Sequence, residues 1–356
     1  DSLRHKGFYN QAAEPGSCHT LEVVMTLLRE EIHQQPDATQ ALLDQEGSRA
    51  RKIAAELKAR EPRYVVLAAR GSSDNAARYG NYVFGSLLRL PVALATPSLY
   101  TLYARPPRLR DALVIGVSQS GQSEDIVAVL AEGRRQGVPT LAITNSPDSP
   151  LAAQADYLLE THAGEERSVA ATKTYTSQLM ALGLLVAGWM DDPALFADLA
   201  AIPAAMRQTL ELEDAIHAAA ARYQRSDHAV VLGRGYNYAT AFEIALKLKE
   251  TCYLAAEPYS PADFLHGPVA LVEAGFPAIV PASVFGATAP SNRINVGAIG
   301  TGRISRTHDM PGVWQYDTAR IMAVCDVDRR RVEDAKVLVN GTYSKKTGKR
   351  YDGVTT

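Results

Sequence analysis

Four segments of the chain carry small polar residues where an apolar run gives way to the next element. These segments are residues 71–73, 118–123, 169–173 and 233–235. The second follows the strand-like run LVIGV and consists of Ser118, Gln119, Ser120, Gly121, Gln122 and Ser123. A strand, a small-residue loop and a helix N-terminus together can bind an anion, because free N–H groups and the helix dipole point outward there. A plain helix-capping turn uses the same residues, and this segment alone supports both interpretations equally.

The helical segment AFEIALKLKE, residues 241–250, carries a charged stripe. Glu243, Lys247 and Glu250 stand at i, i+4 and i+7, so they share one face of the helix. Spacing alone favours an exposed ladder of ion pairs over the lining of a polar cavity. Downstream, His266 lies between apolar residues and a Gly-Pro turn. A histidine in that setting is more often structural, but beside a carboxylate it can shuttle protons.

Alternating strand and helix signals are expected to position these residues. The expected strands are YVVLAA (64–69), PVALA (91–95), LVIGV (113–117), TLAIT (140–144) and YLLE (157–160). Helical periodicity covers residues 21–60 with a break at Gln35-Pro36, and a long helix is expected over 174–190. Continuously apolar strands that alternate with helices predict a parallel sheet covered on both faces. Ligands bind at the carboxyl ends of such strands, where the four polar segments lie.

The pattern restarts after a helical connector over about 193–222. HAVVLGRG at 228–235 resembles YVVLAARG at 64–71, since both are strands that end in Arg-Gly before a polar turn and an Ala-rich helix. This similarity predicts duplication of one α/β unit. The second copy has few strands before the character of the chain changes near residue 277.

The last part of the chain carries a different motif. INVGAIGTGRIS, residues 294–305, predicts a strand, then Gly300 and Gly302 in a tight turn, then a helix, and a second strand ends at Asp326. Glycines at a strand–helix turn followed by an acidic residue about 20 positions on form a dinucleotide-binding fingerprint. The sequence therefore predicts a partial Rossmann βαβ unit with a weak NAD(P) site at Gly300, Gly302 and Asp326. Arg329 and Arg330 leave the choice between NAD and NADP open.

Composition excludes several classes of function. The chain has 356 residues, a formal charge of −2 and an apolar fraction of 46%, which are typical of a soluble globular protein of two or three domains. The chain lacks the excess of basic residues that would predict nucleic-acid binding. It also contains no apolar run that is long enough to span a membrane. The three cysteines are widely spaced, so we expect a cytoplasmic protein without a metal site.

Taken in order, the motifs resemble those of the SIS (sugar isomerase) family. The resemblance rests on ARGSSDN, SQSGQSEDI, VAATKT, GRG, ALKLKE and LHGP, and it covers residues 29–277. Within the family, the chain is most similar to the isomerase portion of glutamine–fructose-6-phosphate aminotransferases and to glucosamine-6-phosphate deaminases. Residues 290–356 resemble the N-terminal piece of Gfo/Idh/MocA oxidoreductases.

The resemblance implies a role for each candidate residue. It assigns Glu250 as the base that enolises the sugar, His266 as the ring-opening residue that reaches a neighbouring protomer's site in a homodimer, and Glu243 and Lys247 as supporting residues. The sugar-phosphate site maps onto Ser72, Ser73, Ser118, Gln119, Ser120, Ser123, Val169 and Ala171, with the phosphate on the SQSGQS turn. The implied activity interconverts a glucosamine-6-phosphate type of substrate with fructose 6-phosphate, and it requires no cofactor.

The expected fold is α/β, with SIS-type parallel sheets that have helices on both faces. Its parts are an N-terminal helical segment (1–45), a full first SIS domain (46–200), a truncated second SIS domain (201–280), a linker (281–291) and the partial Rossmann unit (292–356). We expect two unrelated coding sequences to meet near residues 275–277. Two alternatives stay open: a non-catalytic sugar-phosphate-binding SIS protein, and a fragment of an NAD(P)-dependent oxidoreductase. The amino sugar and the direction of the reaction also stay open.

Overall fold

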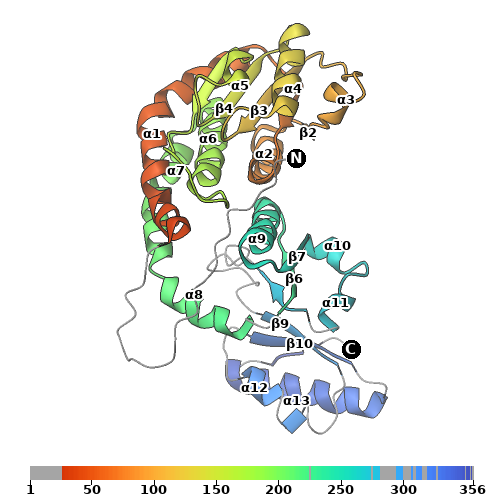
Figure 1. Ribbon diagram of the computed structural model, residues 1–356. Coiled ribbons are helices and arrows are strands. Elements are labelled where there is room, and N and C mark those ends of the chain that lie inside the picture. The colour runs from red at the N-terminus through yellow and green to blue at the C-terminus, as the bar shows by residue number, and fades with distance from the viewer. Residues whose placement is uncertain are drawn as a thin grey trace, which may run out of the picture.

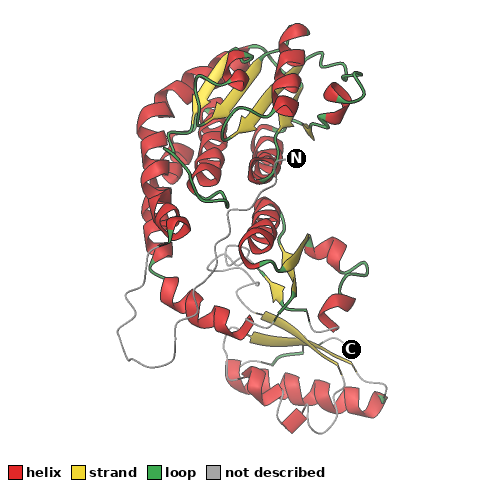
Figure 2. Cartoon of the chain, viewed as in Figure 1, coloured by secondary structure: helices red, strands yellow, loops and turns green. Residues whose placement is uncertain are grey.

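The computed structural model describes most of the chain as α/β layers (Figure 1). The described residues are 26–223, 226–273, 276–280, 294–299, 306–307, 310–314, 319–325, 328–348, 350–352 and 354. Within these residues, no helix has both the length and the apolar character needed to cross a membrane. Figure 2 shows the strands of each sheet with helices packed beside them.

A long helix, α1 (Leu27–Ala59), opens the described chain. The break expected at Gln35-Pro36 does not occur. Pro36 lacks the N–H that would bond the Ile32 carbonyl one turn earlier, but Gln35 Nε2 donates to that carbonyl oxygen at 3.0 Å. A neighbouring side chain therefore replaces the missing backbone bond, and the helix continues through the proline.

The first sheet has five parallel strands in the order β2-β1-β3-β4-β5. They are β1 (Tyr64–Ala68), β2 (Val92–Leu94), β3 (Ala112–Ser118), β4 (Thr140–Thr144) and β5 (Tyr157–Glu160). From β1 the chain first goes outward to β2 and then returns to place β3 on the other side. The strand order therefore reverses between β1 and β3, and this is where open α/β sheets bind ligands.

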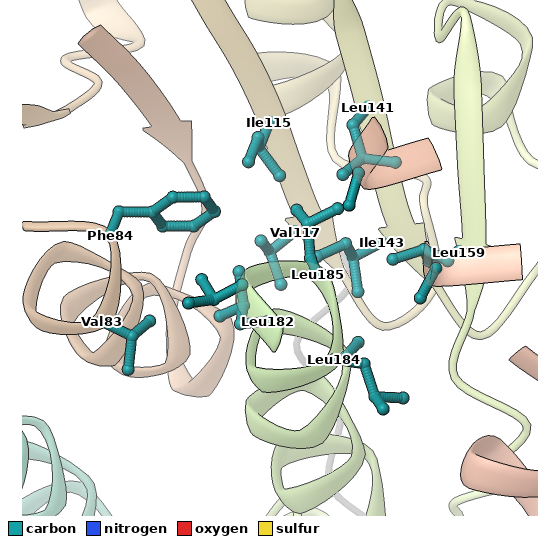
Figure 3. Packing of buried hydrophobic residues seen from close by; sticks show 14 of the residues in the cluster. Val83, Phe84, Ile115, Val117, Leu141, Ile143, Leu159, Leu182, Leu184 and Leu185 are labelled. Atoms are coloured by element: carbon teal, nitrogen blue, oxygen red, sulfur yellow. The ribbon is translucent and has the colours of Figure 1, made fainter. Parts of the chain in front are cut away.

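Successive residues of the strands feed two separate cores, because side chains alternate between the faces of a sheet. On one face, Ile115 and Val117 pack with α1, α2 (Ser72–Leu88) and α6 (Lys173–Met190), as Figure 3 shows for Phe84 and Leu182. On the other face, Val114 packs against α4 (Glu124–Arg135) and the short α5 (Pro150–Ala153). A further short helix is α3 (Ser98–Thr101). The predicted parallel sheet with helices on both faces is thus confirmed.

The second unit repeats the start of the first. Helices α7 (Pro193–Leu210) and α8 (Glu213–Ala220) lead into β6 (His228–Leu232), α9 (Tyr236–Cys252), β7 (Ala255–Tyr259), α10 (Pro261–Phe264), α11 (Ala270–Glu273) and β8 (Ala278–Ile279). The strands form a parallel sheet in the order β7-β6-β8.

Helices α2 and α9 are equivalent elements of the two units. Each has 17 residues and follows a glycine of the same backbone conformation, Gly71 with φ 58° and ψ −134°, and Gly235 with φ 62° and ψ −135°. Each also ends at a left-handed residue, Arg89 or Tyr253. This match supports the duplication expected from the two Arg-Gly strands.

The C-terminal part contains β9 (Ile294–Ile299) and β10 (Ala319–Cys325), which pair in parallel, and the helices α12 (Met310–Trp314) and α13 (Arg329–Thr347). Gly300, Gly302 and Asp326, the predicted nucleotide-binding residues, lie outside the described residues. Dinucleotide binding therefore stays a prediction.

Candidate functional site

The turn after β3 is held in one conformation by its own side chains. Ser118 Oγ accepts the N–H of Gly121 at 3.1 Å, and Ser120 Oγ accepts the N–H of Gln122 at 3.3 Å. Gly121 has φ +64°, and a Cβ atom there would lie 2.1 Å from Ser149 Oγ. Glycine is therefore required at this position for two reasons, namely the left-handed backbone and the contact with the next loop.

The start of α4 leaves a hydroxyl group available. Ser123 is the N-cap residue, yet its side chain makes no capping hydrogen bond. A residue whose purpose was only to cap the helix would bond an N–H of the first turn. The arrangement therefore favours a ligand-binding role for Ser123 over a capping role.

An ion pair connects the turns after β1 and β3. Arg70 Nη2 lies 2.6 Å from Asp125 Oδ2, and Thr101 Oγ1 donates to Asp125 Oδ1 at 2.9 Å. The Arg70 hydrogen bond, followed by the one from Thr101, holds the pKa of Asp125 below its usual range. Because Arg70 precedes Gly71 and Asp125 lies in the first turn of α4, this pair joins the two loops that flank the reversal of strand order.

Helix α9 packs antiparallel against α2 and so reaches the same edge of the sheet. Tyr236 in the first turn of α9 hydrogen-bonds Ser86 near the end of α2, with 2.6 Å between the hydroxyl oxygens. At the other end, Lys247 Nζ donates to Ser72 Oγ in the first turn of α2 at 3.1 Å. The later turns of α9 therefore lie beside the carboxyl end of β1.

The charged stripe on α9 is partly buried rather than an exposed ladder. The Glu243 side chain is only 8% exposed, and its two oxygens accept hydrogen bonds from Ser72 Oγ at 2.9 Å and Asn75 Nδ2 at 2.7 Å. The exposed ladder of ion pairs that spacing alone favoured was therefore a wrong prediction. Spacing within α9 carries no information about Ser72 and Asn75, which lie on α2, far away in sequence. Burial and the charge of Glu243 also raise the pKa of Tyr175, which keeps this phenol protonated.

Lys247 connects the members of this cluster. Its Nζ lies 3.3 Å from Glu243 Oε1 and 2.6 Å from Glu250 Oε2, and the Glu250 side chain is 30% exposed. One ammonium group thus holds a buried carboxylate, a solvent-accessible carboxylate and the Ser72 hydroxyl together. A fixed carboxylate at a ligand-binding edge is suited to transfer a proton to and from carbon.

The loop between β5 and α6, residues 161–172, is anchored by carboxylates that the sequence analysis did not single out. Glu31 of α1, 2% exposed, accepts the N–H groups of Arg167 at 2.6 Å and Ser168 at 3.0 Å. Glu166 accepts the N–H of Thr172 at 2.8 Å. These bonds fix the backbone that carries Val169, a residue that is 95% exposed.

Further anchors hold the end of the same loop. Lys173 Nζ donates to Gln34 Oε1 of α1 at 2.7 Å and to the Glu165 carbonyl at 2.5 Å. Glu166 also accepts the hydroxyl groups of Thr172 and Thr174. Helix α1 and the first turn of α6 therefore set the position of Ala171, and no local sequence signal could have revealed these partners.

A cavity of about 480 Å³ lies between α1, the start of α6 and α9. Its polar lining includes Glu243 and Lys247, and Ala171 also borders it. The remaining lining residues are Leu28, Ile32, Gln35, Ala170, Thr172, Tyr175, Thr176, Leu179, Thr240, Ile244, Leu248 and Thr251. The SQSGQS turn is not part of this lining.

The structure brings some of the predicted site residues together and leaves others apart. Ser72, Glu243, Lys247 and Glu250 form one bonded cluster. The remaining candidates make no direct bond to this cluster: Ser73, Ser118, Gln119, Ser120, Ser123, Val169 and Ala171. Of these, Ala171 shares the lining of the cavity with Glu243 and Lys247. His266 is exposed in the turn after α10, and its backbone N–H donates to the Asp263 carbonyl at 3.0 Å.

Comparison with known sequences identifies the family to which the chain is similar. The chain matches the SIS domain over residues 59–188 and 223–294. It is 36% identical over 285 residues to the isomerizing glutamine–fructose-6-phosphate aminotransferase of Symbiobacterium thermophilum, an alignment that covers 75% of this chain and 46% of that protein. The enzyme of the same name from Escherichia coli K12 is 35% identical over 282 residues, covering 75% and 45%. The chain thus spans less than half the length of these relatives.

Solved structures share the fold. A putative phosphosugar isomerase from Silicibacter pomeroyi DSS-3 is 32% identical, covers 91% of this chain and 99% of its own, and has a TM-score of 0.63. Glucosamine-6-phosphate deaminase from Thermotoga maritima has a TM-score of 0.58 at 17% identity, with 93% of this chain and all of that chain (100%) covered, which shows likeness of fold alone. None of these matches extends the resemblance to dinucleotide-binding oxidoreductases.

Proposed function

The chain belongs to the SIS domain family, and from this premise we propose that it moves the carbonyl group of a hexose 6-phosphate between C1 and C2. The observation that carries the proposal is the cluster around Lys247, which links Glu243, Glu250 and Ser72 at the reversal of strand order. An aldose–ketose isomerisation needs one base that transfers a proton between neighbouring carbons, and Glu250 occupies a suitable position.

We assign the phosphate to the turn after β3. Ser118 and Ser120 already use an oxygen lone pair to accept backbone N–H groups, so each hydroxyl proton remains free to donate to a phosphate oxygen. Ser123 adds a hydroxyl at the positive end of the α4 dipole. With the phosphate anchored there, the reacting carbons extend toward the α9 cluster, which gives the orientation that proton transfer requires.

The proposed chemistry begins with glucosamine 6-phosphate in its open-chain form. Glu250 removes the proton from C2 and forms an enolamine. Its carboxyl group, which is 30% exposed and can exchange that proton with solvent, then delivers a proton to C1. The product is a ketimine at C2, and water hydrolyses it to fructose 6-phosphate and ammonia. Lys247 keeps the Glu250 carboxylate in place and stabilises the negative charge that develops on the C1 oxygen.

His266 is assigned to opening the sugar ring in the site of a neighbouring protomer. Its exposure in the turn after α10 leaves the imidazole accessible to a second copy of the chain. This assignment predicts complementation, because an inactive Glu250→Gln chain and an inactive His266→Asn chain together form hybrid dimers with one intact site. Mixing the two purified variants should restore measurable turnover, and a mixture as inactive as its components would refute the shared site.

We propose that the chain is divided into parts as the sequence predicts. Residues 46–200 form the full SIS domain, 201–280 a truncated second one, and 1–45, 281–291 and 292–356 the N-terminal helical segment, the linker and the Rossmann-like piece. The substrate and the widely spaced cysteines fit a cytoplasmic enzyme.

The direct test is turnover of glucosamine 6-phosphate, measured as fructose 6-phosphate and ammonia released. We expect turnover without added metal or nucleotide. A chain that binds the sugar phosphate in calorimetry but never releases fructose 6-phosphate would instead be a non-catalytic sugar-phosphate-binding protein.

A further inference from the structure

The cavity between α1, α6 and α9 has an apolar character that a phosphorylated sugar does not need. Leu28 and Ile32 of α1 face it from one side, Leu179 of α6 from another, and Ile244 and Leu248 of α9 close it. A hexose phosphate carries a hydroxyl or charged group on almost every carbon. Apolar walls would leave such groups without hydrogen bonds, which is unfavourable. The cavity is therefore suited to an apolar part of a ligand.

The same cavity adjoins the reacting end of the proposed site. On α9, Thr240, Ile244, Leu248 and Thr251 form a stripe next to the charged one, and Glu243 and Lys247 belong to both the cavity lining and the α9 cluster. Lys247 Nζ is only 2.6 Å from the Glu250 carboxylate. An apolar group in the cavity would therefore be attached close to the carbons on which Glu250 acts.

The cavity also borders the loop that carries the candidate sugar contacts. Ala170, Ala171 and Thr172 belong to its lining. Ala171 offers only a methyl group there, so this position presents no hydroxyl to the cavity. The volume of about 480 Å³ falls within the usual range of small-molecule pockets, about 300–1,000 Å³.

We propose that this cavity binds an apolar substituent on the amino nitrogen of the substrate, so that the enzyme acts on N-alkylated amino-sugar 6-phosphates. The inference rests on the proposed function and names its substrate class. The chemistry is unchanged: the C2–H bond breaks, a C1–H bond forms, and water adds to the C2=N bond. The C2–N bond then breaks, and its electron pair stays on the nitrogen. The products are the alkylamine and fructose 6-phosphate.

The experiment compares glucosamine 6-phosphate with its N-butyl derivative on the full chain. Each butyl carbon buried in an apolar site strengthens binding about fourfold, so burial of two of the four carbons should raise kcat/KM for the N-butyl compound at least about tenfold above that for glucosamine 6-phosphate. Equal or lower kcat/KM for the N-butyl compound would overturn the inference while leaving the proposed function intact.

Two neighbouring leucines provide a matched pair of variants. Leu28→Trp puts a large ring into the cavity and should lower the preference for the N-butyl compound about tenfold. Leu27→Trp makes the same change one residue earlier on α1, outside the lining, and should keep the wild-type preference. An unchanged preference in Leu28→Trp would contradict the assignment of this cavity.

Calorimetric binding of the two compounds tests the cavity independently of the proposed activity. If neither compound is turned over, the proposed function fails, but calorimetric affinities for the two compounds still test the cavity. Tighter binding of the N-butyl compound, weakened in Leu28→Trp alone, would support the cavity as an apolar subsite. Equal affinities in all three proteins would refute it.

Discussion

Replacement of Glu31 by glutamine should loosen the loop between β5 and α6. The Glu31 carboxylate is 2% exposed and accepts two backbone N–H groups, from Arg167 at 2.6 Å and Ser168 at 3.0 Å. A glutamine amide has one acceptor oxygen, so its NH2 group faces the other N–H. One charge-assisted bond is lost and one buried donor stays unpaired, which together should lower the free energy of unfolding by about 3 kcal/mol.

The same substitution should also affect substrate binding, because the loop carries Val169 and Ala171. We expect KM for glucosamine 6-phosphate to rise about tenfold, equivalent to about 1.4 kcal/mol, with a smaller change in kcat. Glu30→Gln is the matched control, since Glu30 is exposed in the same turn of α1. It should change the free energy of unfolding by no more than about 0.5 kcal/mol, through the helix dipole.

The pH dependence of stability distinguishes anchoring of the loop by the charged Glu31 carboxylate from simple packing of its side chain. Burial raises the pKa of Glu31, but the hydrogen bonds from Arg167 and Ser168 and the charge of Lys173 outweigh it, so the net pKa lies below 4.5. A carboxyl group whose pKa is lowered by folding stabilises the protein above its unfolded-state pKa and loses that contribution as pH falls through the folded value.

Urea unfolding of wild type and Glu31→Gln at several pH values measures this contribution. The difference in unfolding free energy should be constant near neutral pH and shrink below about pH 4.5. If Glu31→Gln unfolds and binds substrate like the Glu30→Gln control, the carboxylate does not anchor the loop.

Two further substitutions test the turn after β3 and the charged stripe. Gly121→Ala should lower the free energy of unfolding by about 3 kcal/mol, because its Cβ would clash with Ser149 Oγ, while Gly137→Ala, with φ +75° and open space, should lower it by about 1 kcal/mol. If urea unfolding shows the same loss of unfolding free energy in both glycine variants, the close approach of Gly121 to Ser149 does not constrain this turn. Lys247→Met should lower kcat about 100-fold, because Glu243 and Glu250 lose their shared cation, whereas Lys249→Met, at a side chain that is 45% exposed, should retain wild-type kcat.

The five strands of the first sheet were predictable from sequence because each is a short, largely apolar run, whereas β7, with the sequence AAEPY, lacks this signal and was not predicted. LVIGV and TLAIT fall inside β3 and β4 as observed. The parallel sheet followed from their alternation with helices, and the duplication followed from two strands that end in Arg-Gly. These are local signals, and burial on both faces of a parallel sheet is what produces them.

Contacts between distant segments were not predictable in the same way. Pro36 was expected to end a helix, but the Gln35 side chain supplies the missing bond. Spacing on α9 favoured an exposed ladder, yet Ser72 and Asn75 of α2 bury Glu243. Both partners lie about 170 positions earlier, as the separations of 171 and 168 residues show, so helical periodicity carries no information about them.

Exchange of substrate hydrogen with solvent shows whether Glu250 acts as the base. Wild-type chain incubated with glucosamine 6-phosphate in D2O should place deuterium at C1 of the fructose 6-phosphate product, followed by NMR. Glu250→Gln should lower this exchange at least about 100-fold, since the amide cannot accept the C2 proton. Glu257→Gln, an exposed glutamate on β7, serves as the control and should exchange like wild type. Exchange by Glu250→Gln at the control rate would show that another group removes the C2 proton.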